Sequence, residues 1–267
     1  MLYMLESSYL LQTFFNLNVI SIHVKMDLDL EHLIYLVNSI FMFLNFIVIF
    51  FSSLLIIPKK RVFHYFLSHI SITSSIAYLM LANDLLTIPL DNGKIMYNAR
   101  YLDWSLNTPV QLIILGKMAN LSAPNIYILA FLSVVMTLYG WLGDLADSVF
   151  KWIFFTKGAI VMIPIYIFLF DDFNYYTVKD FSGEFIAKKY YWMGRSLLTV
   201  WSFYPIIWVL DNTGVISSLS SCIAYTASDF LSKVVFTLWI FHCVQNSNYI
   251  GETIASQEFL SEKNDDS

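Results

Sequence analysis

Long apolar stretches separated by short polar ones make up most of this chain. Segments of roughly 20 or more mainly apolar residues, enough for a helix to cross about 30 Å of hydrocarbon, recur seven times. The pattern predicts an all-α membrane protein whose seven-transmembrane-helix bundle occupies residues 29–245. The predicted spans cover approximately residues 32–57, 62–86, 97–119, 124–146, 149–170, 190–211 and 217–244.

Four segments fall outside these spans. Residues 1–28 are predicted to be an N-terminal interfacial extension, since a signal peptide would need a basic start and a clear cleavage site. Residues 246–267 end in SEKNDDS and are predicted to be a disordered cytoplasmic tail. The step Asp91-Asn92-Gly93 predicts a tight hairpin turn before the third span, and residues 171–189 are predicted to form the one sizeable polar loop.

The composition supports the membrane assignment and excludes several alternatives. Charged residues make up 13% of the chain and hydrophobic residues 58%, whereas soluble domains carry about 25% charged residues. A net charge of −5 argues against a nucleic-acid partner. Cys222 and Cys243 are expected about 30 Å apart on one helix, too far for a disulfide. No metal site is predicted.

Lysine and arginine residues set the expected orientation. With the N-terminus outside, the first, third and fifth loops and their helix ends hold eight basic residues, and the positive-inside rule then places the C-terminus in the cytoplasm. The absence of an internal sequence repeat argues against inverted-repeat transporters. The eight residues are Lys59, Lys60, Arg61, Lys117, Lys179, Lys188, Lys189 and Arg195.

Five ionisable residues fall deep within spans, where each costs about 2.5–3.5 kcal/mol and usually serves a function. They are Arg100, Asp103, Lys157, Asp229 and Lys233. One interpretation is a buried ion-pair network that only holds helices together, although such burial seldom repays its desolvation cost. The other is a desolvated lysine that condenses with an aldehyde as a Schiff base and needs a carboxylate partner.

Three motifs carry a resemblance to a known family. They are ARYLDWSLNTP in the third span, Trp201-Ser-Phe-Tyr204-Pro205-Ile-Ile-Trp208 in the sixth and Asp229-x-x-x-Lys233 in the seventh. In type, order and span they resemble the microbial (type 1) rhodopsins, the bacteriorhodopsin-like retinal proteins. The resemblance covers about residues 58–245.

The resemblance implies a role for each charged residue. All-trans retinal would be bound covalently to Lys233 through a Schiff base. Asp103 would be the primary counterion and proton acceptor, Asp229 the second counterion, and Arg100 would couple to proton release. Asn107 stands where the family usually has Thr, and its amide can still donate a hydrogen bond to the counterion.

The resemblance also implies a retinal pocket, while ordinary helix packing is the alternative for each isolated aromatic residue. The polar Gln111 and Ser232 would shift absorption to the blue by stabilising the charged ground state. The pocket residues expected from the motifs are Trp104, Trp201, Tyr204, Trp208, Thr108, Pro205, Gln111 and Ser232, together with Tyr78, Met136, Gly140, Phe155 and Met162.

Departures from the family pattern bear on mechanism. Ile114, with Leu67 expected beside it, stands where proton pumps place the carboxylic proton donor, so we expect a slow, pH-sensitive photocycle. Thr213 and Ser221 fall near the places of the family's release carboxylates, and Asp211 is one candidate substitute.

Two kinds of residue in the spans have no assigned family role. Lys157 is expected either to extend towards the outer surface or to face a neighbouring helix. For His64 and His69 a hydrogen-bonded packing role is favoured over tuning of a counterion.

Three functions are consistent with this pattern, none of them enzymatic. An outward light-driven proton transporter is favoured because Asp103 offers an acceptor. A light-gated cation channel and a sensory photoreceptor acting through a separate partner are the alternatives, although the second span lacks the glutamates of many channelrhodopsins. A homo-oligomer in the cell membrane is expected.

Overall fold

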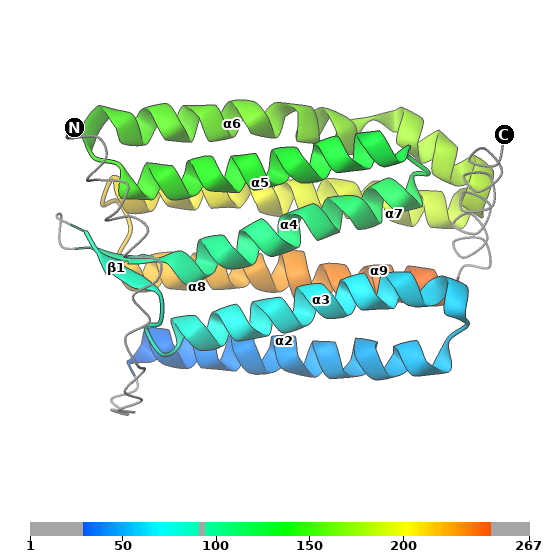
Figure 1. Cartoon of the computed structure of the whole chain (residues 1–267), viewed down its shortest axis with the longest axis horizontal. Coiled ribbons are helices and arrows are strands. Elements are labelled where there is room, and N and C mark those ends of the chain that lie inside the picture. Colours follow the sequence, from blue (N-terminus) through cyan, green and yellow to red (C-terminus); the bar gives the residue numbers. More distant parts are fainter. Residues whose placement is uncertain (1–28, 91–93, 247–267) are drawn as a thin grey trace, which may run out of the picture.

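A computed structural model describes residues 29–90 and 94–246 as a bundle of long helices that lie side by side (Figure 1). Each helix packs on the preceding one, and α2 also packs on α8, which closes the bundle. The predicted all-α bundle is therefore confirmed, with a helical rod at each of the seven predicted spans. The rods are α2 (Leu30–Leu55), α3 (Pro58–Leu81), α4 (Asn98–Met118), α5 (Ala123–Leu145), α6 (Ser148–Phe170), α7 (Asp172–Asn212), and the last one formed by α8 (Ser218–Asp229), η1 (Phe230–Val235) and α9 (Phe236–Asn246).

The helices differ in how polar they are. Five rods in the described part of the chain are long and apolar enough to cross a membrane by length and composition alone. The other two, α3 and α4, are of similar length but less apolar. Their polar side chains, among them Ser71, Ser74, Asp103 and Asn107, are buried inside the bundle. Polarity is thus turned inwards, as expected where the outside is hydrocarbon.

A short hairpin caps one end of the bundle. Strands β1 (Thr87–Pro89) and β2 (Ile95–Tyr97) pair antiparallel, with Ile88 opposite Met96. The predicted hairpin is confirmed, while its turn at residues 91–93 lies outside the described residues. The C-terminal end of α9 lies at the opposite end of the bundle (Figure 1). Below, these are called the hairpin end and the far end.

Two predicted boundaries are wrong. The second span begins at Pro58, because proline suits the first helical turn, and ends at Leu81 rather than at residue 86. The predicted polar loop is mostly helix: α7 starts at Asp172 and is interrupted at Gly183. Apolar side chains within that stretch are buried, including Val178 at 1% exposure, and this burial stabilises the additional turns.

The ends of the chain divide differently. Asn246, predicted to open the tail, is the last residue of α9. The predicted interfacial extension at residues 1–28 and the rest of the predicted tail lie outside the described residues.

A π-helical turn, η1, interrupts the last rod. Such turns often occur at functional sites, and this one contains Ser232 and Lys233, both buried. Asp229 is the last residue of α8, directly before the turn. The turn therefore sets how the lysine is presented to the interior of the bundle.

Candidate functional site

The ammonium group of Lys233 lies between the two predicted carboxylates. Its Nζ forms a very close ion pair with Asp103 Oδ2 and lies 2.9 Å from Asp229 Oδ1. All three side chains are at most 3% exposed. An unpaired charge at this depth would be strongly unfavourable, so the pairing explains why α4 and the last rod tolerate these residues.

Polar residues of α3 and α4 hold Asp103 in place. Its Oδ1 accepts hydrogen bonds from Ser74 Oγ at 2.9 Å and from Asn107 Nδ2 at 2.6 Å. Asn107 Nδ2 also lies 2.9 Å from Ser74 Oγ, and Asn107 Oδ1 accepts from Thr73 Oγ1 at 2.7 Å. The amide that replaces the family's usual threonine therefore does contact the carboxylate.

Asp229 is bound by a different set of donors. Tyr78 donates to its Oδ2 at 2.7 Å, and Tyr204 and Trp104 donate to its Oδ1 at 2.6 Å and 3.1 Å. Hydrogen bonds to a charged acceptor are about twice as strong as neutral ones. With three donors besides Lys233, Asp229 is stabilised as an anion more completely than Asp103, which has two.

Arg100 lies one aromatic layer from the carboxylates. Its Nη2 donates to Tyr35 Oη at 3.2 Å, and its guanidinium carbon lies 4.2 Å from the centre of the Tyr225 ring, in cation–π range. Among the described residues Arg100 forms no direct ion pair. Direct ion pairing among the deep charged residues therefore joins only Asp103, Asp229 and Lys233 within the described part of the chain.

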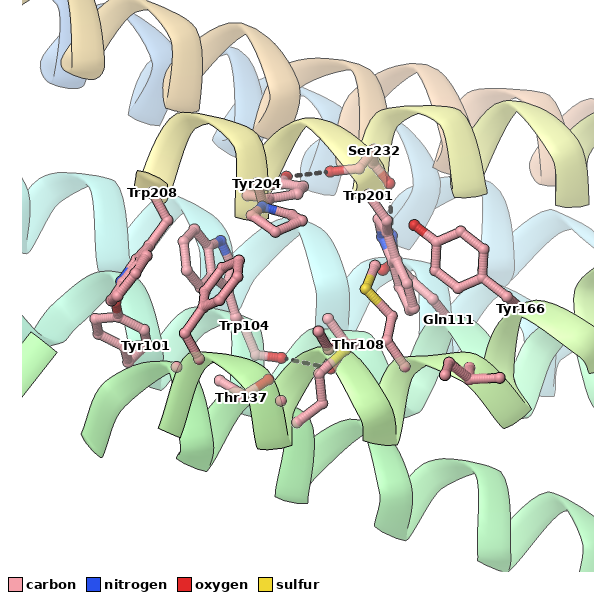
Figure 2. Close-up of a pocket in the computed structure, with 18 of the residues that line it drawn as sticks. Tyr101, Trp104, Thr108, Gln111, Thr137, Tyr166, Trp201, Tyr204, Trp208 and Ser232 are labelled. Carbon is pink, nitrogen blue, oxygen red and sulfur yellow. Dashed lines mark hydrogen bonds between the residues drawn. The ribbon is translucent and has the colours of Figure 1, made fainter. Parts of the chain in front are cut away.

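A cavity of about 530 Å³ opens at Lys233 and extends between α4, α5, α6 and α7. Aromatic side chains from α4 and α7 line it on two sides (Figure 2). Every predicted pocket residue lines it except Tyr78, which is completely buried beside Asp229 and hydrogen-bonds to it instead. A direct contact of Tyr78 with retinal stays a prediction. The predicted residues that do line the cavity are Trp104, Thr108, Gln111, Met136, Gly140, Phe155, Met162, Trp201, Tyr204, Pro205, Trp208 and Ser232.

The lining gives the cavity its shape. Phe155 stacks on Trp208 with ring centres 4.9 Å apart, and Trp104 meets Tyr204 edge to face at 5.0 Å. A Cβ on Gly140 would lie 3.4 Å from the Tyr101 ring, so the absence of a side chain there preserves space. The result is an apolar cavity within the usual size of ligand pockets, with an amine at one end. Such a site fits a long apolar aldehyde like retinal.

Sequence reasoning missed part of the lining. Several missed residues lie on one face of α6, at intervals of three or four residues. An apolar face can normally be found from such spacing. On α6 it cannot be distinguished, because the helix is apolar on all sides. The missed residues are Tyr101, Thr137, Gly158, Ala159, Ile163, Tyr166, Ile167, Phe170 and Tyr225.

Two polar residues at the lysine end are tied together. Gln111 Nε2 donates to the backbone oxygen of Ser232 at 2.5 Å, and Ser232 Oγ lies 3.0 Å from Tyr204 Oη (Figure 2). Both residues are buried. The Gln111 amide and the Ser232 hydroxyl are thus held in place at the residue that directly precedes Lys233.

The apolar surroundings predicted at the position of the proton donor are observed around Ile114 of α4. Ile114 and Leu67 are fully buried in one apolar cluster. Lys157 has an exposed side chain on α6, with its ammonium 5.9 Å and 5.7 Å from the ring centres of Tyr139 and Phe154. The ammonium thus lies near the Tyr139 ring of the neighbouring α5, and extension towards the outer surface stays a prediction. His64 is fully buried and hydrogen-bonded, as expected.

At the hairpin end the structure contains a half-buried carboxylate that sequence reasoning missed. Asp144 accepts from Tyr101 Oη at 2.5 Å and from Asn212 Nδ2 at 3.2 Å. The expected substitute, Asp211, is instead paired with Lys94 at 3.5 Å and is about one-third exposed. Asp144 was overlooked because it falls near a span end, where charge is ordinary.

Fold and site together define a seven-helix bundle with a lysine-centred apolar pocket. The family described as bacteriorhodopsin-like protein matches residues 29–247. The chain belongs to this family, the microbial rhodopsins, and is therefore an integral, multi-pass membrane protein of a retinal-binding family.

Individual relatives are distant. The chain is 28% identical over 189 residues to the opsin-like protein carO of Fusarium fujikuroi, covering 66% of this chain and 61% of carO. It is 26% identical over 156 residues to sensory rhodopsin-2 of Natronomonas pharaonis, covering 58% and 64%. These matches span less than two thirds of either relative.

Solved structures share the fold over more of the chain. Thermophilic rhodopsin from Rubrobacter xylanophilus has a TM-score of 0.75 at 25% identity and covers 83% of this chain and 99% of that one. A light-driven proton pump from Leptosphaeria maculans has a TM-score of 0.71 at 24% identity, covering 79% and 95%.

Proposed function

We propose that this protein is a light-driven outward proton transporter that carries all-trans retinal covalently on Lys233. The observation that carries the proposal is the close ion pair of Lys233 Nζ with Asp103, which offers a proton acceptor at the end of the apolar cavity. Retinal, when bound, supplies absorption of visible light and a light-driven change of shape beside the lysine nitrogen. The remaining chemistry belongs to the side chains of this chain.

Asp103 is the favoured acceptor of the proton held on Lys233 Nζ. Its carboxylate has two other hydrogen-bond donors, whereas Asp229 has three. Donors to the charged form stabilise it, so Asp229 keeps its charge and Asp103 takes the proton. Asp229 then acts as the second counterion.

The basic residues of the loops support an N-terminus outside the cell, which places the hairpin end outside and the far end in the cytoplasm. A proton leaving Asp103 towards the hairpin end meets the layer around Arg100. Beyond Tyr101 lies Asp144, a half-buried carboxylate suited to receive it in place of the missing release pair.

Two properties should accompany transport. Ile114 supplies no proton from the α4 side, so return of a proton to Lys233 is slow and depends on the pH of the solution at the far end. Gln111 and Ser232 place dipoles beside the charged nitrogen, which favours absorption at shorter wavelength.

Photocurrents from illuminated, voltage-clamped cells test the proposal. An outward current that changes little with driving force is the expected result for a pump. A current that reverses with membrane potential indicates a light-gated channel, and absorption without current indicates a sensor, the class to which one relative's name belongs. Either of the last two results would replace the proposed function.

A further inference from the structure

A buried polar stripe runs along α3 from the level of the site to the far end. Lys60, His64, Ser68 and Ser71 follow one another at intervals of four, four and three residues, so they share one helix face. All four are at most 6% exposed. The stripe spans about 16 Å at 1.5 Å per residue.

The stripe is connected to the site through α2 and α9. Asn45 of α2 donates from Nδ2 both to Ser71 Oγ at 2.8 Å and to Thr237 Oγ1 at 2.7 Å. Thr237 lies four residues beyond Lys233. The polar side chains of α2, α3 and α9 thus form one seam, here called the polar seam: Asn45, His64, Ser68, Ser71 and Thr237.

Three buried atoms of the polar seam have no hydrogen-bond partner within the described residues. They are Asn45 Oδ1, Ser68 Oγ and His64 Nε2. Buried polar atoms are almost always satisfied by protein or by ordered water, and a buried water usually binds about three such atoms. Three orphaned atoms along one seam therefore indicate a site for a short file of water molecules.

His64 is the titratable group of this seam, and its Nε2 is one of the three atoms without a partner. Its Nδ1 lies 3.2 Å from the backbone oxygen of Lys60, which can only accept, so Nδ1 carries the hydrogen and Nε2 is free to accept a proton. The ring packs against Phe241 of α9 at 5.3 Å between ring centres. Lys60, one turn nearer the end of α3, is the charged side chain adjacent to it.

We propose that the polar seam is a hydrated proton path and that His64 is the relay through which a proton from the far end returns to Lys233. This inference rests on the proton cycle proposed above, in which Lys233 Nζ gives its proton to Asp103. It places the return path between α2, α3 and α9 rather than beside Ile114.

The transfer balances without any redox step. His64 takes a proton from water at the far end onto Nε2. The Nε2–H bond then breaks, the proton passes along the water and hydroxyl file past Ser68, Ser71 and Thr237, and an N–H bond forms at Lys233 Nζ. His64 returns to neutral, and one positive charge has moved from the far end to the site.

Flash photolysis of the full-length retinal-loaded protein tests the relay. The rate at which Lys233 Nζ regains its proton should fall about 100-fold in His64→Phe, the lower end of the range for loss of a positioned proton-transfer group. His64→Gln should slow it similarly, and Ser68→Ala less. Sodium azide, a small weak acid, should restore the rate in both His64 variants. The matched control is His69→Phe, which alters a histidine on the same helix outside the polar seam and should leave the rate unchanged.

Unchanged rates in both His64 variants, or equal slowing in His69→Phe, would overturn the relay. A second readout needs no retinal: histidine ¹⁵N NMR of the apoprotein should show transfer between water and the His64 ring, and its absence would also overturn the proposal. Proton movement in illuminated liposomes is measured in parallel. A wild type that moves no protons would refute the proposed function, while the rate comparison would still decide the role of His64.

Discussion

Towards the hairpin end, the two carboxylates beside Lys233 are surrounded by named donors, whereas towards the far end the polar seam leaves three buried atoms without a protein partner. The first arrangement fixes charge in one geometry, because each carboxylate is held from two helices or more. The second leaves buried polar atoms that ordered water would satisfy. In the proposed cycle, Asp103 accepts the proton on one side of Lys233 and the polar seam returns it from the other side. Variants in these two regions therefore test transport.

Removing the lysine gives the largest expected effect. Lys233→Ala deletes the proposed attachment point, so absorption of visible light by the protein purified with retinal should be lost completely. An absorption spectrum measures this directly. Lys157→Ala is the control, since Lys157 lies on the exposed face of α6, and it should keep its colour. Visible absorption in Lys233→Ala would contradict the assignment.

Loss of the acceptor should come next. Asp103→Asn keeps the shape and the contact with Asn107 but cannot take up a proton, so light-driven proton movement in liposomes should fall by at least about 100-fold. Its absorption should also move to longer wavelength because a negative charge beside Lys233 Nζ is gone. Asp211→Asn, at the surface pair with Lys94, serves as the comparison. Full transport in Asp103→Asn would identify Asp229 as the acceptor instead.

Adding a donor to the apolar side should have a moderate effect. Ile114→Asp places a carboxyl among fully buried apolar residues, where burial favours its neutral, proton-carrying form. The return of the proton to Lys233 should become faster, as followed by flash photolysis, because a positioned carboxyl can give its proton directly. Ile114→Asn, which is polar but carries no proton to give, should not accelerate it. Equal rates in both variants would indicate that this side never becomes accessible to protons.

The smallest effect is expected for colour. Gln111→Leu removes the amide that bonds the Ser232 carbonyl, so absorption should shift to longer wavelength. The excitation energy should fall by about 1–3 kcal/mol, the scale of a hydrogen bond near a charged group. Ser232→Ala should shift it in the same direction. A shift to shorter wavelength in either variant would refute the dipole argument.

Much of the molecule could be predicted because its signals are local. The apolar runs fix the number of helices, and the spacing of Asp229 and Lys233 fixes one ion pair within a single rod. The contact between Asp103 and Lys233 could be predicted only from the family motifs, since 130 positions separate them. The helix over residues 172–182 could not be read from composition, because tertiary burial of Val178 outweighs its polar neighbours.

What sequence reasoning missed at the site has a similar origin. The resemblance implies Tyr78 as a pocket residue, but its hydrogen bond to Asp229 depends on how α3 lies beside α8. Asp144 and the polar seam depend on partners from other helices, Tyr101 in one case and Asn45 in the other. No spacing within one helix reveals such cross-helix contacts.

The π-helical turn η1 determines how the residues of the last rod are positioned around the helix axis. One residue fewer in this turn would restore an ordinary α-helix, and each residue turns a helix by about 100°. Because the turn holds the extra residue within itself, deleting one residue there would leave Asp229 and Thr237 close to their places and would instead move Lys233 relative to Asp229. The position of Lys233 relative to Asp229 on one side and to the polar seam on the other therefore depends on this single turn. A chimaera that exchanges α9 for that of a relative must keep the turn.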